Sequence, residues 1–166
     1  MSDVEEMLKK IEKYINDPTK GLPEEVFLFI TKITPMVNVD LLVKDVDGRI
    51  LLAWRNDLYH GNGWHVPGGI LRVKETFEER IQKTAENEIG CHVIASKKPI
   101  EVVPIISNDL TIRCHFITFI YECKLPEDFQ INNGKLKSNE TGYLEWHKKY
   151  PGKMLSVHRF YKKYFE

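Results

Sequence analysis

The segment from Gly68 to Gly90 constrains this chain more than any other stretch. A glycine pair follows Pro67, and glycine lets the backbone approach a ligand closely. After Thr76, apolar residues recur every four positions. This spacing predicts a helix with one buried stripe, made of Phe77, Ile81, Ala85 and Ile89. Gly90 is then a natural stop for that helix.

The end of the predicted helix places three polar residues on one face. Thr84, Asn87 and Glu88 follow the i, i+3, i+4 spacing, so their side chains meet on the helix surface. Side chains that bind a metal ion from a helix need this spacing. The segment therefore predicts a loop that approaches a ligand, joined to a helix with a possible metal ligand at its end.

The same segment resembles the Nudix box, a pattern of glycines and glutamates in a loop and helix. The matching positions are Gly69, Glu75, Glu88 and Gly90. The departures are equally informative. Lysine replaces the arginine of the box and two neutral residues replace its glutamates, at Lys83, Thr84 and Asn87. Glu88 is thus the only helical carboxylate that the resemblance predicts as a metal ligand. Glu75 is expected to brace the loop rather than to bind metal.

The motif Trp64–Gly69 before the thinned box is similar to the GDP-mannose mannosyl hydrolase branch of the Nudix superfamily. That branch hydrolyses a sugar–phosphate bond, whereas most Nudix enzymes cleave a phosphoanhydride. The resemblance implies an α/β (α+β) fold, a mixed β-sheet sandwiched between α-helices, and an enzyme that depends on Mg²⁺.

Composition narrows the class of protein. The 166 residues are 42% hydrophobic and 29% charged, which is ordinary for one globular domain. Basic and acidic residues number 24 each, so no overall positive field favours nucleic acid. The early apolar run Val26–Ile30 is too short for a membrane span or signal peptide, and we expect a cytoplasmic protein. Cys91, Cys114 and Cys123 lack a CxxC pair, which favours reduced thiols.

Periodicity and turn residues predict the remaining elements. We expect a capped amphipathic helix over 3–16 and a second helix from Leu22 to Ile33. Strands are predicted over 37–43, 49–54, 64–66, 92–95, 100–106, 111–123 and 143–146, with a hairpin turn at 45–48, a surface loop at 56–63 and a C-terminal helix over 154–165. Residues 1–33 then form a helical extension to a Nudix-like domain at 34–166. Their apolar surface predicts packing on that domain or on a second copy in a homodimer.

The resemblance also implies a metal site. The backbone carbonyl of Gly68 and the carboxylate of Glu88 correspond to ligands, and a late loop supplies a third. Alignment on Trp146 places Glu140 at the ligand position of that loop and Thr141 at the position of the catalytic base. Magnesium commonly takes one or two carboxylates, waters and substrate phosphates, so this thin set is sufficient. Threonine is a poor general base.

Two further positions match substrate contacts of the branch. Asp40 and Arg55 correspond to the aspartate and arginine around the diphosphate leaving group, and a guanidinium can clamp phosphate oxygens. Ile70 stands where the branch has an arginine, and Phe116 stands where it has a tyrosine. We expect Arg72 to compensate for part of that loss.

The general base stays open among His60, His65 and His115. Three functions follow. The first is a Mg²⁺-dependent hydrolase of a nucleoside diphosphate sugar, like GDP-mannose, that releases sugar and nucleoside diphosphate. The second is a Nudix pyrophosphatase that cleaves the phosphoanhydride of a related nucleotide. The third is a nucleotide-sugar binding protein without catalysis, suggested by Thr141 and the missing helical acids.

Overall fold

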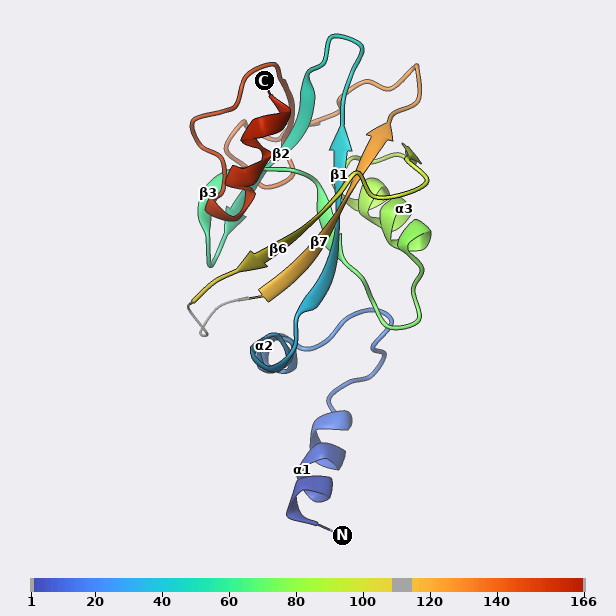
Figure 1. Cartoon of the computed structure of the whole chain (residues 1–166), viewed down its shortest axis with the longest axis vertical. Coiled ribbons are helices and arrows are strands. Elements are labelled where there is room, and N and C mark those ends of the chain that lie inside the picture. Colours follow the sequence, from blue (N-terminus) through green and yellow to red (C-terminus); the bar gives the residue numbers. More distant parts are fainter. Residues whose placement is uncertain (1, 109–114, 166) are drawn as a thin grey trace.

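A computed structural model describes residues 2–108 and 115–165 (Figure 1). Two short helices come first, α1 (Asp3–Glu12) and α2 (Glu24–Ile33). The predicted capping box at the start of α1 is present, because Ser2 and Glu5 exchange hydrogen bonds. Helix α1 ends earlier than the predicted residue 16.

The strands form two sheets. The first contains β1 (Met36–Val43), β4 (Gly68–Ile70), β5 (Ile94–Ala95), β6 (Glu101–Ile106) and β7 (His115–Lys124), and the second contains β2 (Ile50–Asp57), β3 (Gly61–His65) and β8 (Leu144–His147). The first sheet is mixed, since β1 and β7 are parallel and its other pairs are antiparallel. This mixed α+β architecture confirms the predicted fold class.

Strand β1 lies between two hydrophobic cores. Val39, Leu41 and Val43 pack with Ile81 and other residues of α3 (Phe77–Glu88). Leu42 points to the opposite side and packs in a core that includes the C-terminal 3-10 helix η1 (Ser156–Tyr164). A strand covered on both faces is apolar on both faces, as expected for a central strand.

The box helix forms as predicted. Thr76 caps α3 through a capping box with Glu79, and Ile81, Thr84 and Ala85 are buried. Gly90 has φ +88°, the left-handed conformation that suits glycine after a helix. At the other end of the chain, the predicted C-terminal helix is present but is 3-10 rather than α.

Two predicted connections are correct only in part. Residues 45–48 turn, with an antiparallel bridge at Lys44–Ile50 and a hydrogen bond from the Asp45 amide to the Arg49 carbonyl, yet β1 and β2 continue into different sheets. Within the predicted loop at 56–63 only residues 58–60 turn, because β2 continues to Asp57 and pairs there with Gly61 of β3. Backbone pairing carries this hairpin although its side chains are polar, so apolar alternation could not reveal it. Residues 111–114, including Cys114, lie outside the described residues.

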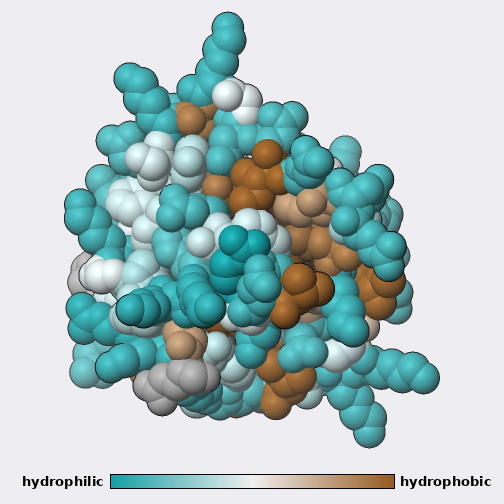
Figure 2. Space-filling view, turned by 90° about the horizontal axis from the view of Figure 1, so that it is seen from above, coloured by the Kyte–Doolittle hydropathy of each residue, from teal (hydrophilic) through white to brown (hydrophobic). Residues whose placement is uncertain are grey.

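The N-terminal helices differ in how they pack. Phe27 and Thr31 of α2 are buried, whereas no residue of α1 is. Helix α1 projects from the body beyond α2 (Figure 1), and Val4, Met7 and Leu8 are exposed. The opposite end of the molecule is mainly hydrophilic, with separate apolar patches (Figure 2). Among the described residues, no helix has the length and hydrophobicity to cross a membrane.

Candidate functional site

A cavity of about 310 Å³ opens where β1, β2, β4, α3 and η1 meet. The structure brings most of the predicted site residues to its walls: Asp40, Arg55, His60, Gly68, Arg72 and Glu88. Apolar residues complete the lining, including Ile70, Ile105, Phe116 and Val157. The cavity therefore combines charged groups with an apolar wall, as small-molecule sites commonly do.

Glu88 lies in the last turn of α3 and is held on both oxygens. Arg55 Nη2 donates to one oxygen at 3.2 Å, and His65 Nε2 lies 3.1 Å from the other. His65 Nδ1 lies 2.8 Å from the carbonyl oxygen of Ala53, so both ring nitrogens face oxygen atoms of the protein. Burial raises the pKa of Glu88, but His65 and Arg55 together lower it below its usual value.

Asp40 is buried at the back of the cavity. The Tyr161 hydroxyl donates to it at 2.5 Å and the Asn38 amide donates at 2.6 Å. Burial raises the pKa of Asp40 to about 7, although both hydrogen bonds oppose this shift. Gly68 is paired with Asp40 between β1 and β4, and a Cβ atom on Gly68 would lie 2.1 Å from an Asp40 oxygen. The buried carboxyl group thus explains why position 68 is glycine.

The second glycine of the pair has a similar explanation. A Cβ atom on Gly69 would lie 2.4 Å from the hydroxyl oxygen of Thr84 in α3. That hydroxyl is buried and has no hydrogen-bond partner among the described residues. It lies one helical turn before Glu88 and beside the same cavity, so it is a polar group that a bound ligand can satisfy.

Glu75 braces the loop before α3, as predicted from the sequence. Its carboxylate accepts hydrogen bonds from the Arg72 backbone amide at 2.9 Å, from Arg80 at 2.7 and 2.8 Å, and from Lys83 at 2.8 Å. Burial raises the pKa of Glu75, but these hydrogen bonds and charges lower it to about 2. Glu75 is not a lining residue of the cavity.

The histidines occupy different places. His60 lines the cavity, and its backbone amide donates to Asp57 at 2.8 Å. His115 lines a separate depression beside α2. His158 of η1 also lines the cavity, which sequence reasoning missed. Burial holds the pKa of His158 well below its usual value, and its Nδ1 accepts from the Val66 amide at 3.3 Å. No local pattern distinguished His158, because its contacts join distant segments.

The structure does not bring Glu140 to the cavity. Its carboxylate accepts from the backbone amide of Lys137 at 3.0 Å, within its own turn. The hydroxyl of Thr141 accepts from the Asn56 amide at 3.0 Å. Within residues 2–108 and 115–165, no group of three or more His, Cys, Asp or Glu side chains is arranged to hold a metal. The metal role of Glu140 stays a prediction.

The oxygen donors at the cavity fit a magnesium ion that has few protein ligands. Glu88 is ionised and lines the cavity together with Gly68, and the Thr84 oxygen lacks a partner among the described residues. Magnesium usually keeps several waters and takes other oxygens from substrate phosphates. One carboxylate is therefore compatible with a metal that binds together with a phosphorylated ligand.

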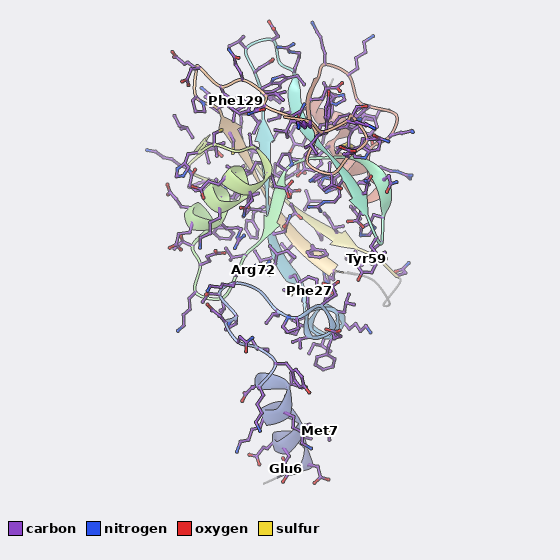
Figure 3. The ribbon with its side chains drawn as sticks, turned by 180° about the vertical axis from the view of Figure 1, so that it is seen from behind. Glu6, Met7, Phe27, Tyr59, Arg72 and Phe129 are labelled. Carbon is purple, nitrogen blue, oxygen red and sulfur yellow. The ribbon has the colours of Figure 1, made fainter. Side chains whose placement is uncertain are left out.

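The N-terminal segment contacts Arg72 and Tyr59 of the body. A Cβ atom on Gly21 would lie 3.3 Å from the guanidinium of Arg72, and the Tyr59 hydroxyl donates to Glu24 at 2.8 Å. Figure 3 labels Arg72, Phe27 and Tyr59 near the junction between α2 and the body, and Met7 on the projecting α1. The linker therefore lies against Arg72, which lines the site, and α2 contacts the turn between β2 and β3.

Comparison with known proteins identifies the fold and the family. The low-salt glycan biosynthesis protein Agl8 of Haloferax volcanii is 32% identical over 76 residues, which are 46% of this chain and 48% of that protein, so the aligned part spans about half of each. A solved UDP-X diphosphatase superposes with a TM-score of 0.57 at 22% identity, covering 97% of this chain and 74% of its own. A MutT NUDIX hydrolase from Burkholderia pseudomallei gives 0.60 at 20% identity, covering 78% and 97%.

These two structures share the fold. The family assignment comes from a model of the NUDIX domain, which matches residues 34–149 and therefore contains the whole box helix and the cavity residues from β1 to α3. Because the match covers well over half of the sequence, this chain belongs to the Nudix hydrolase family.

Proposed function

We propose that the protein is a magnesium-dependent hydrolase of a nucleoside diphosphate sugar, with a substrate similar to GDP-mannose. The observation that carries the proposal is the meeting of Glu88, Arg55 and Asp40 at one cavity beside the glycine pair. The context of the relative named for glycan biosynthesis agrees with a nucleotide-sugar substrate.

Each residue has a chemical task in this proposal. Arg55 donates to phosphate oxygens and stabilises negative charge on the departing diphosphate, while Glu88 and the Gly68 carbonyl supply oxygen ligands. A bound Mg²⁺ would offset the charge of the diphosphate oxygens. Asp40 and Arg72 line the same cavity and contact the substrate.

His60 is the best supported of the three predicted bases. His65 already has an acceptor at each ring nitrogen, and His115 lies at a different depression. His60 borders the cavity and is only partly buried, so its ring is accessible to a bound substrate. A His60→Gln variant that hydrolyses substrate as fast as the wild type would exclude this assignment.

Product analysis tests the proposal. Purified protein is incubated with GDP-mannose, UDP-glucose and ADP-ribose, with and without Mg²⁺, and the products are separated by chromatography. Attack on the sugar carbon gives nucleoside diphosphate and free sugar, as proposed for GDP-mannose. Attack on phosphorus gives nucleoside monophosphate and a sugar phosphate instead. No cleavage of any substrate at any Mg²⁺ concentration would refute both hydrolases.

Binding without catalysis is the second candidate, and one observation favours it. Both oxygens of Glu88 already have protein partners, and the late loop that was expected to add a ligand turns Glu140 toward Lys137. Calorimetry distinguishes the two functions. Tight binding of GDP-mannose, with residual turnover that is the same in Glu88→Gln, would establish the binding protein.

The exposed apolar face of α1 extends the proposal to a homodimer. Val4, Met7 and Leu8 are more than half exposed, and an isolated helix this short is marginal in water. Acidic residues occupy its first turn and basic residues its last, so two antiparallel copies have complementary charges. A monomer mass in sedimentation at assay concentration would refute the dimer, and Leu8→Lys should weaken it more than Lys10→Gln, which removes only one of the complementary charges.

A further inference from the structure

A second hollow adjoins the cavity, and the charged residues that line the two hollows differ. It measures about 520 Å³, compared with about 310 Å³ for the cavity. Strands β2 and β3 form one wall, and residues 153–159 form the other. His60 and Leu155 line both hollows, so the two are neighbours along one surface. We call the second hollow the groove.

The walls of the groove are held by the protein itself. The Trp64 amide donates to the Lys153 carbonyl at 2.8 Å, and the Leu155 amide donates to the Trp64 carbonyl at 2.9 Å. A Cβ atom on Gly63 would lie 2.4 Å from the Lys153 oxygen, which shows how closely this segment packs on β3. The groove therefore has its shape before any ligand binds.

Asn56 fixes the opposite wall. Its side-chain oxygen accepts from the Trp54 indole at 2.9 Å, and its amide nitrogen donates to the Asn139 carbonyl at 3.4 Å. Asn62, which pairs with Asn56 across the β2–β3 hairpin, lines the same wall. A site with fixed walls loses less conformational entropy on binding than a mobile one.

The charges of the groove contrast with those of the cavity. In the cavity, Arg55 pairs with Glu88 and Arg80 pairs with Glu75. The groove has two cations, Lys153 and Arg159, and neither forms an ion pair within the part of the chain that the structure describes. The described residues that line the groove include no Asp or Glu. Its positive charge is thus not neutralised by the surrounding side chains.

We infer that the groove binds a second anionic group of the substrate, on the part of a nucleotide derivative that extends past His60. The inference rests on the proposed function, because a diphosphate in the cavity is what directs the rest of the substrate into the groove. A carboxylate on the sugar and an additional phosphate on the nucleoside both have the required charge. Lysine and arginine bind either group through charge-assisted hydrogen bonds.

Two matched pairs of nucleotide derivatives test the inference. UDP-glucuronate differs from UDP-glucose by a sugar carboxylate, and NADP⁺ differs from NAD⁺ by one phosphate. Affinities are measured by calorimetry without added metal, and as KM where turnover occurs. The wild type is expected to bind the anionic member of one pair about five- to tenfold more tightly, and added salt should reduce this preference. The pair that shows the preference identifies the source of the charge.

Variants separate the groove from general electrostatics. The double variant Lys153→Gln/Arg159→Gln should lose the preference while it binds the neutral member like the wild type. Lys162→Gln, on the same 3-10 helix but not a lining residue of the groove, should keep the preference. Equal affinities within both pairs, or a preference that survives in the double variant, would overturn the inference. If UDP and the neutral members also fail to bind with Mg²⁺ present, the proposed function itself is wrong, and the inference falls with it.

Discussion

Glu75 and Glu88 frame the same helix, and each is an ionised carboxylate with cationic neighbours. Their surroundings differ. Glu75 receives hydrogen bonds from Arg80, Lys83 and a backbone amide, and its side chain is only 6% exposed. The Glu88 side chain is 23% exposed and borders the cavity. The Glu75 carboxylate is held by groups of the protein, whereas the Glu88 carboxylate is accessible to a ligand in the cavity.

The two ends of this short segment serve stability and function separately. The loop end of α3 needs a fixed shape, because it positions the glycine pair against Asp40 and Thr84. The other end needs a carboxylate that is ionised but still accessible. Substitutions at the two glutamates should therefore affect different measurements.

The largest effect is expected for Glu88→Gln, on activity. Glutamine keeps the shape but removes the charge that the proposed metal site requires, so kcat/KM should fall on the order of 100-fold or more. Initial rates with GDP-mannose and Mg²⁺ measure this. Glu86→Gln is the matched control, because Glu86 is exposed on the same helix and its carboxylate pairs with His92. Equal losses of kcat/KM in the two variants would show that Glu88 is not part of the site.

The second effect is expected for Glu75→Gln, on stability. The lowering of its pKa from 4.5 to about 2 corresponds to about 3 kcal/mol of folding free energy near neutral pH. Urea denaturation should show a loss of about 2–3 kcal/mol, with Glu79→Gln, at the exposed start of α3, as a milder comparison. A stability change below about 0.5 kcal/mol would show that the loop is not braced by Glu75.

The same pKa predicts how the stability difference depends on pH. The folded state lowers the pKa of Glu75, so the carboxylate stabilises the fold fully above its unfolded pKa of about 4.5. This contribution is lost as pH falls toward 2. The gap between wild type and Glu75→Gln, measured at several pH values, should therefore shrink between about pH 5 and 2. A gap that stays constant over this range would contradict the assigned ion pairs.

Local sequence patterns predicted much of the segment from Gly68 to Gly90, which contains Glu75 and Glu88. The glycine pair, the helix, its stop at Gly90 and the bracing role of Glu75 all depend on residues that are close in sequence. Local spacing and backbone conformation determine such features. The resemblance to the Nudix box added the position of Glu88, and the structure places it at the cavity with Arg55 and Asp40.

Features that join distant segments were not predictable in this way. His158 and Tyr161 reach the cavity and Asp40 from the C-terminal helix, across more than half of the chain. The division into two sheets depends on the pairing of β2 with β3, which follows it directly, and with β8, which lies far along the chain. Alignment on Trp146 located Glu140 in the sequence. The direction of its carboxylate, however, depends on the hydrogen bond that it accepts from the Lys137 amide.

The smallest expected effect concerns Lys74, which precedes Glu75 and has φ +62°, an unfavourable conformation for a residue with a side chain. Glycine adopts this conformation without the steric cost, although it makes the unfolded chain more flexible. Lys74→Gly should therefore stabilise the protein by at most about 1 kcal/mol and leave kcat/KM unchanged, since the strain lies at the structural end of α3. Thermal unfolding and initial rates measure the two quantities. A loss of activity without a loss of stability would mean that the loop around Glu75 also takes part in the chemistry at Glu88.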